Sequence, residues 1–242
     1  MTINDSPTIM TTPNTSQLSS RVLHEDNHLI VVNKLPSEIV QGDKTGDTPL
    51  SEIVKDYIRS KYQKPGNVFT GVIHRIDRPV SGVVVFARTG KALARMNDLV
   101  KNRGLKKIYW AIVQNRPEKD KADLKHYLVR NRKKNKSFAN NKPTNDSKEG
   151  LLSYKIIGES DKYFLLEIDL KTGRHHQIRA QLAAIGCPIK GDLKYGSPRS
   201  NKDASISLHA RSVEFIHPVK KEVIKVVAPP PKDALWDFFS DV

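Results

Sequence analysis

Apolar residues recur along the chain with two spacings, one typical of β-strands and the other of α-helices. Apolar or alternating runs predict strands at residues 28–33, 82–89, 106–114, 150–159 and 163–171, and a last strand and short helix between Val223 and Phe239. Residues 159–162 have the length of a hairpin turn between two of these strands. Trp236, near the end of the chain, is expected to pack rather than to bind a ligand.

Two segments show the 3.6-residue spacing of amphipathic helices. Thr48 is expected to cap the first helix, with Pro49 at its first position and Pro65-Gly66 as its stop. Its apolar face consists of Leu50, Ile53, Val54, Tyr57 and Ile58. The second helix covers roughly residues 91–103 and ends at Gly104. Periodicity alone therefore supports one domain of mixed helices and strands.

The first twenty residues differ from the rest. They contain no lysine or arginine and no continuous apolar run, so they match neither a secretory signal nor a typical transit peptide. We expect residues 1–20 to be a disordered tail and residues 21–242 to form the folded domain.

The charge of the chain points to a polyanionic partner. Lysine and arginine number 41 against 26 acidic residues, a formal net charge of +15, which favours association with phosphates through counterion release. A merely soluble basic protein is the alternative. A membrane surface is disfavoured, because the sequence has no long apolar segment and no amphipathic helix with a clean basic face. Nucleic acid is therefore the leading partner.

Cysteine and histidine usage gives no sign of a metal or cofactor. Cys187 is the single cysteine, which excludes an internal disulfide and agrees with a reducing cytosol. The eight histidines are scattered without the spacing of a metal motif. We expect no metal, no cofactor and a cytoplasmic location.

Residues 115–150 interrupt the pattern of strands and helices. The segment is rich in Lys, Asn and Asp, and Arg132, Lys133 and Lys134 are consecutive within it. It is either a solvated, partly disordered loop or a basic arm that grips phosphates.

The stretch HRIDRPVSG places Asp77 between Arg75 and Arg78, immediately before an apolar strand. Nearby positive charges favour the ionised form of a carboxyl group. An ionised Asp77 suits a nucleophile or a base, and it equally suits a structural ion pair.

A second polar stretch covers residues 172–196, TGRHHQIRAQLAAIGCPIKGDLKYG. The apolar stripe of a helix is expected at Ile178, Leu182 and Ile185. His175 and Arg179 are four residues apart, so they would share the opposite face. A cation near a helix start is disfavoured by the helix dipole, so Arg179 needs a negative partner, either Asp77 or RNA phosphate.

These stretches together carry a family resemblance. HRIDRPVSGVVVFART, KKIYWAIV, TGRHHQIRAQLAAIGCPIKGDLKYG and SLHARSVEFIHP resemble, in order and spacing, the RluA family of RNA pseudouridine synthases over about residues 21–235. The resemblance implies an α+β fold, with a mixed and largely antiparallel sheet, flanking helices and a central RNA-binding cleft. It also implies that uridines in RNA are isomerised to pseudouridine after base flipping.

The resemblance also assigns roles to individual residues. It implies that Asp77 is the catalytic aspartate, that the ring of Tyr109 packs on the target base, and that Arg179 pairs with Asp77. In the light of this resemblance, Arg75 and Arg78 look like phosphate contacts or helpers in flipping, and we also expect Arg174 and His175 to contact RNA. The basic residues Arg132, Lys133 and Lys134 would contact it if the 115–150 segment is a basic arm. Ribosomal RNA is the favoured substrate and transfer RNA the other candidate, and a monomer without an obligate protein partner is expected.

The chain departs from the family pattern at a few positions. His175 stands where the family usually has a small hydroxyl residue, Ala180-Gln181 replaces a Val-His pair, and Pro79-Val80 replaces an acidic residue and threonine. The small RNA-binding domain that precedes many family members is not expected here. Selectivity would then depend on the catalytic domain and its basic segment.

Two other classes of function remain open. The chain is alternatively an inactive RNA-binding or ribosome-assembly factor on the same fold. A carboxylate glycosidase would need a second catalytic carboxylate, for which Asp192 is the nearest candidate, but the basic charge disfavours a sugar polymer.

Overall fold

The computed structural model describes residues 17–239. Their elements in chain order are β1 (Val22–Glu25), β2 (Leu29–Lys34), α2 (Leu50–Lys61), β3 (Gly71–Val72), β4 (Ser81–Ala87), α3 (Gly90–Lys101), β5 (Lys106–Val113), β6 (Lys121–Asn131), β7 (Lys136–Asn140), β8 (Lys148–Glu159), β9 (Phe164–Leu170), α4 (Gln177–Ala184), η1 (Leu193–Tyr195), β10 (Leu208–Ile216), β11 (Val223–Val227) and α5 (Ala234–Phe238). None of these helices is long and apolar enough to cross a membrane.

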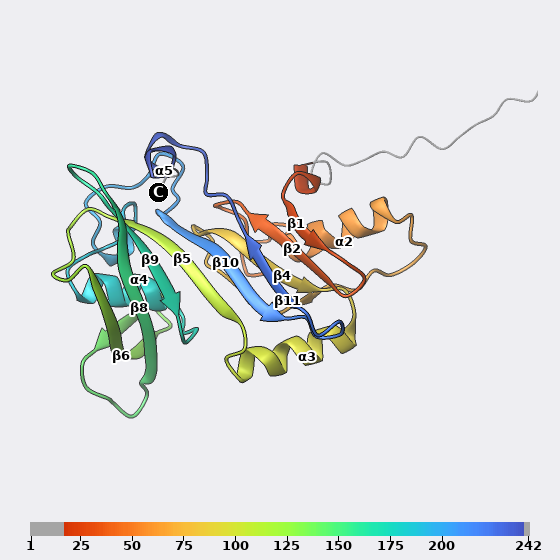
Figure 1. Cartoon of the computed structure of the whole chain (residues 1–242), viewed down its shortest axis with the longest axis horizontal. Coiled ribbons are helices and arrows are strands. Elements are labelled where there is room, and N and C mark those ends of the chain that lie inside the picture. Colours follow the sequence, from red (N-terminus) through yellow and green to blue (C-terminus); the bar gives the residue numbers. More distant parts are fainter. Residues whose placement is uncertain (1–16, 240–242) are drawn as a thin grey trace, which may run out of the picture.

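One curved sheet organises the fold (Figure 1). Its strand order is β1-β2-β4-β10-β5-β9-β8-β6-β7, with β11 added to β10 and β3 to β4. Every pairing is antiparallel except that of β4 with β10, which is parallel and short. The expected α+β fold with a largely antiparallel sheet is therefore confirmed.

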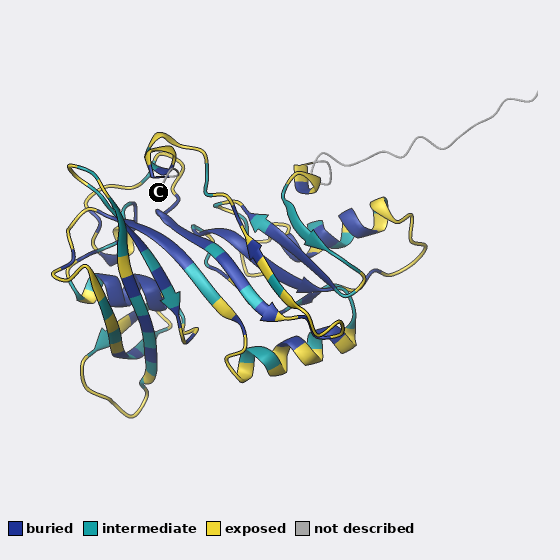
Figure 2. Cartoon of the chain, in the orientation of Figure 1, coloured by how far each residue is buried: buried dark blue, intermediate teal, exposed yellow. Residues whose placement is uncertain are grey.

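Helices cover both faces of the sheet. Helices α2 and α4 share one apolar core with residues of β2, β4, β5 and β9. Helix α3 packs on the opposite face of β2 and β4, and α5 packs behind β5 and β9, where Trp236 is buried as expected. Figure 2 shows the result, in which the central strands are buried and α3 exposes its outer side. Because both faces of β4 are covered, its seven residues are all buried.

The first predicted helix begins one residue later than expected. Pro49 is the N-cap of α2 and its first turn has no side-chain cap, so the prediction that Thr48 caps the helix is wrong. Backbone carbonyls of the preceding loop take over this role. The Leu50 amide donates to the Ile39 carbonyl at 2.7 Å, and the Ser51 amide donates to Val40 at 3.2 Å.

The basic segment 115–150 is ordered. Strands β6 and β7 lie within it and form a hairpin that continues the sheet beyond β8, so the alternative of a solvated, partly disordered loop is wrong for these residues. The side of the hairpin that faces α4 buries Leu128 in one apolar cluster with Ala180 and Tyr195. Lys121, Asp123 and Lys125 are exposed on the other side of β6, which explains how a charged segment forms a strand.

The prediction of a disordered tail over residues 1–20 extends a few residues into the folded domain. Residues 1–16 lie outside the described residues. Leu18, however, is fully buried in the main core, and its carbonyl accepts from the Arg21 amide at 2.9 Å. The folded domain therefore includes residues that we assigned to the tail.

Gly82 allows β4 and β10 to approach each other. Its φ is +115°, and a Cβ atom there would lie 2.3 Å from the Ala210 carbonyl oxygen and 2.6 Å from the Ala210 nitrogen. These contacts are with backbone, which has little room to move.

We expect Gly82→Ala to destabilise the protein by about 2 kcal/mol or more, because it combines a strained φ with a backbone clash. Gly90→Ala is the matched control. Gly90 begins α3 with open space around it, so alanine there should be neutral or stabilise the fold by up to about 1 kcal/mol. Urea unfolding of both variants measures the difference. Equal stabilities would contradict this account of the strand pairing.

Candidate active site

A cleft of about 680 Å³ opens beside the middle of the sheet. It is lined by the 74–80 loop before β4, the α3–β5 connection, strand β5 and the segment from Leu170 to Arg179. Eight basic side chains line it: Arg75, Lys101, Arg103, Lys107, Arg130, Lys171, Arg174 and Arg179. Among the described residues at the cleft, Asp77 supplies the one carboxylate. The cleft is therefore suited to a polyanion.

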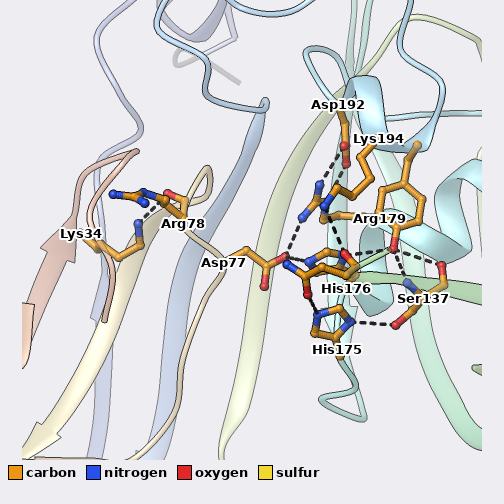
Figure 3. A network of polar contacts seen from close by, with 11 residues as sticks. Lys34, Asp77, Arg78, Ser137, His175, His176, Arg179, Asp192 and Lys194 are labelled. Atoms are coloured by element: carbon orange, nitrogen blue, oxygen red, sulfur yellow. Dashed lines mark hydrogen bonds and ion pairs between the residues drawn. The ribbon is translucent and has the colours of Figure 1, made fainter. Parts of the chain in front are cut away.

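Arg179 joins Asp77 to a second carboxylate that the sequence analysis did not connect with it (Figure 3). Its Nη1 donates to Asp77 Oδ2 at 3.0 Å, and its Nε and Nη2 donate to the two oxygens of Asp192 at 2.7 and 2.8 Å. Burial disfavours the guanidinium charge, but hydrogen bonds and the charges of Asp192 and Asp77 outweigh it and raise the pKa of Arg179. The expected pairing of Arg179 with Asp77 is present.

The two carboxylates differ in their exposure. The Asp192 side chain is 1% exposed and both its oxygens are bound to Arg179, whereas Asp77 is 31% exposed and lines the cleft. Asp192 therefore cannot serve as the second catalytic carboxylate of a glycosidase. It orients Arg179, and Arg179 orients Asp77.

His176 contacts Asp77 from the same side as Arg179. Its backbone is left-handed, with φ 52° and ψ 27°, a conformation that costs a non-glycine residue about 1 kcal/mol or more. In this position its Nε2 lies 3.5 Å from Asp77 Oδ2, and its Nδ1 is hydrogen-bonded to the Tyr195 hydroxyl at 3.0 Å. Burial lowers the pKa of His176 to about 3, so a neutral imidazole faces the carboxylate.

The loop that carries Asp77 is anchored by a buried lysine. Lys34 Nζ donates to the carbonyls of Leu35, Glu38 and Arg78 at 2.8, 2.8 and 3.0 Å. Burial lowers its pKa to about 7, although the nearby Glu38 and Asp77 charges oppose this shift. The backbone directly after Asp77 is thus fixed to the end of β2.

Tyr109 enters the cleft from β5. In the strand register it lies opposite Ala210 of β10, which in turn lies opposite Gly82 of β4, so the sheet sets its position relative to the 74–80 loop. Burial, and to a smaller extent the Asp77 charge, raises the pKa of Tyr109, which keeps the phenol protonated. The structure therefore brings Asp77, Tyr109 and Arg179 to one cleft.

The arginines on either side of Asp77 in the sequence do not form ion pairs with it. Within the described chain, Asp77 forms an ion pair with Arg179, and the neutral ring of His176 lies 3.5 Å away. Arg75 is exposed and lines the cleft. Arg78 points elsewhere, where its Nε donates to the Ser37 carbonyl at 3.0 Å and its Nη2 binds Asp47.

Two other predicted RNA-contacting residues, Arg174 and His175, also line the cleft. His175 lies before α4 rather than on it, so the prediction that it shares a helix face with Arg179 is wrong. Its ring stacks on His176 at 3.8 Å between centroids, and its Nδ1 is hydrogen-bonded to Ser137 Oγ of β7 at 2.9 Å. The residue that departs from the family pattern thus holds the β6–β7 hairpin against the site.

The three consecutive basic residues of the 115–150 segment lie outside the cleft. Arg132, Lys133 and Lys134 are exposed in the β6–β7 turn and do not belong to the cleft lining, which Arg130 reaches instead. Between residues 17 and 239, no group of three or more His, Cys, Asp or Glu side chains is placed to hold a metal ion.

A family model described as RNA pseudouridylate synthase matches residues 28–184. The chain belongs to this family. The matched region includes Asp77, Tyr109 and Arg179, although Asp192 lies beyond it. The expected enzyme class, an RNA pseudouridine synthase, is therefore confirmed.

Curated relatives agree with the family model. The chain is 30% identical to an uncharacterized RNA pseudouridine synthase, YhcT, of Bacillus subtilis, over 88% of this chain and 69% of the relative. It is 33% identical to the ribosomal large subunit pseudouridine synthase C of Buchnera aphidicola subsp. Acyrthosiphon pisum, over 88% and 68%. Synthase D of Xylella fastidiosa is 30% identical, over 88% and 66%. The chain thus spans about two thirds of the length of these relatives.

The fold agrees with solved structures of the family. Human RNA pseudouridylate synthase domain containing 4 superimposes with a TM-score of 0.80 and 20% sequence identity, covering 93% of this chain and 94% of the other. Human RNA pseudouridylate synthase domain containing 1 gives a TM-score of 0.73 at 21% identity. At these identities the likeness concerns the fold alone.

We expect Asp192→Asn to lower both stability and pseudouridine formation, although Asp192 does not line the cleft. The variant leaves a buried guanidinium with one carboxylate fewer, at a cost of about 3 kcal/mol of folding free energy. Asp56→Asn is the control, because the Arg59–Asp56 pair is exposed and should contribute little. Chemical unfolding and product formation are measured for both. An active Asp192→Asn enzyme of unchanged stability would contradict the positioning role.

Proposed function

We propose that this enzyme converts specific uridines of structured RNA, with ribosomal RNA favoured, into pseudouridine, and that Asp77 is its catalytic carboxylate. The supporting observation is the placement of Asp77. It is the one acidic side chain among the described residues of a cleft lined by eight basic ones, and a buried arginine fixes its orientation.

The reaction needs the target base to leave its stack. A flipped uridine loses a few kcal/mol of stacking and pairing, and the ring of Tyr109 is placed to restore part of it by packing on the base. The buried, protonated phenol presents an uncharged surface to the base. Arg75, exposed at the same cleft, would contact the strand from which the base is extruded.

Asp77 would then act on the ribose. The glycosidic bond between N1 and C1′ breaks, the uracil turns, and a bond forms between C5 and C1′. The proton lost from C5 balances the proton gained at N1, so substrate and product are isomers. The carboxylate has two possible tasks, attack on C1′ or removal of a sugar proton, and in both the hydrogen bond from Arg179 keeps it aimed.

The remaining predicted contacts form a wider RNA surface in this proposal. Arg174 and His175 line the cleft itself. Arg132, Lys133 and Lys134 extend this surface to the turn of the β6–β7 hairpin, where they would bind phosphates outside the cleft. Arg78 is already paired with Asp47, so its role would be to hold the loop.

Ribosomal RNA is favoured because relatives of this chain are named ribosomal large subunit pseudouridine synthases. Transfer RNA is the competing substrate, since it also presents uridines in structured loops. We further propose that the enzyme works in the cytoplasm as a monomer without metal or cofactor.

Mapping pseudouridines in total RNA from a strain that lacks this protein tests the proposal. One or a few sites should disappear, most directly in ribosomal RNA, and wild-type protein should restore them whereas Asp77→Ala should not. Asp56→Ala is a control for expression and should restore the sites, because Asp56 lies on the exposed side of α2. A map that never changes would favour the inactive RNA-binding alternative, and sites confined to transfer RNA would replace the favoured substrate.

A further inference from the structure

Lys107 is a cation in the cleft that has no protein partner. It lies on β5 two residues before Tyr109, so both side chains emerge from the same face of the strand. The side chain is half-buried and lines the cleft. Within residues 17–239 the Lys107 side chain makes no hydrogen bond, ion pair or ring contact.

The other buried cations of the protein are satisfied. Arg179 is bound by Asp192 and Asp77, Lys34 by three carbonyl oxygens, and Arg88 by Glu25 and the Asp26 carbonyl. A buried charge without a partner is costly, so one that persists beside an open cleft suggests a ligand.

The surroundings of Lys107 do not supply a negative charge. His74 is its neighbour, and burial together with the Lys107 charge lowers the pKa of His74 to about 3, so that ring is neutral. Burial also lowers the pKa of Lys107 itself, and no nearby carboxylate opposes the shift. Apart from Asp77, the other charged residues that line the cleft are all positive.

Gly173 leaves room for the Lys107 ammonium group. A Cβ atom at Gly173 would lie 3.3 Å from Lys107 Nζ, so a larger residue would crowd the ammonium group. The Lys107 ammonium thus lies against the turn between β9 and α4, which also carries the exposed Lys171 and Arg174.

We propose that Lys107 Nζ binds a backbone phosphate of the RNA strand next to the flipped uridine. This inference rests on the proposed function, because it takes the base to lie against Tyr109. Residues i and i+2 of a strand are roughly 7 Å apart, which is close to the distance between neighbouring phosphates of an RNA strand. A phosphate at Lys107 would therefore fix the nucleotide register that brings one uridine to Asp77.

Lys106 provides a matched control on the same strand. It is exposed and points to the opposite face of the sheet, where it lines a separate hollow together with Lys155 and Glu167. Lys106→Met and Lys107→Met remove the same charge one residue apart. Lys107→Arg keeps the charge and tests whether a defect comes from its loss, and thermal unfolding verifies that each variant is folded.

The experiment measures the affinity of each protein for a short oligouridine RNA over a series of salt concentrations. Loss of one phosphate contact to a single strand should reduce the slope of log K against log salt by roughly 0.7. We expect this reduction in Lys107→Met, little change in Lys106→Met, and a slope near that of the wild type in Lys107→Arg. A wild-type slope in Lys107→Met, or an equal loss in Lys106→Met, would overturn the inference.

A parallel assay separates this inference from the proposed function. Wild-type protein is incubated with ribosomal RNA from the strain that lacks it, and pseudouridine is measured. If the wild type forms product and Lys107→Met keeps the wild-type salt slope, the phosphate site at Lys107 is refuted and the proposed function stands. If the wild type forms no product but Lys107→Met has a reduced salt slope, the proposed function on this RNA is refuted. Lys107 is then a phosphate contact, but not one next to a flipped uridine.

Discussion

The buried guanidinium of Arg179, held between two carboxylates, is the interaction on which the site depends. Three of its nitrogens are used, two by Asp192 and one by Asp77. The fork of donors in arginine is planar and rigid, so fixing one side of it fixes the direction of the other. Because Asp192 is fully desolvated and Asp77 is partly exposed, the first acts as the anchor and the second remains available to a ligand.

The fold brings these groups together from distant parts of the chain. Asp77 comes from the loop before β4, Tyr109 from β5, Arg179 from α4 and Asp192 from the turn before η1. The short parallel pairing of β4 with β10 sets the spacing between the first two, and Gly82 permits that close contact. A change in this central pairing would therefore move the carboxylate relative to the aromatic ring.

Part of this arrangement was predictable from the sequence. A cation in the first turn of a helix needs a negative partner, and this requirement limited the candidates for Arg179 to Asp77 and RNA phosphate. The family resemblance chose Asp77, and the structure contains that pair. Asp192 was not assigned to the pair, because its side-chain direction depends on a tight turn that apolar periodicity does not describe. The expectation that Arg75 and Arg78 contact RNA stays a prediction; Arg75 lines the cleft, whereas Arg78 is paired with Asp47.

The β6–β7 hairpin was the largest element that the sequence did not reveal. The exposed positions of its strands are mostly charged, and Leu128 and Ala139 belong to a small apolar cluster. That cluster is completed by α4 and Tyr195, which lie far along the chain. Tertiary contacts, and the hydrogen bond between His175 and Ser137, therefore order a segment whose composition is typical of a loop.

The most direct test of the central claim is the rate of pseudouridine formation by purified protein with Asp77→Asn. The asparagine keeps the shape of the side chain and removes its charge. With ribosomal RNA that contains the unmodified target, the wild type should form product, whereas Asp77→Asn should bind the RNA with similar affinity and form none. Product formation by Asp77→Asn at the wild-type rate would contradict the assignment of Asp77 as the catalytic carboxylate.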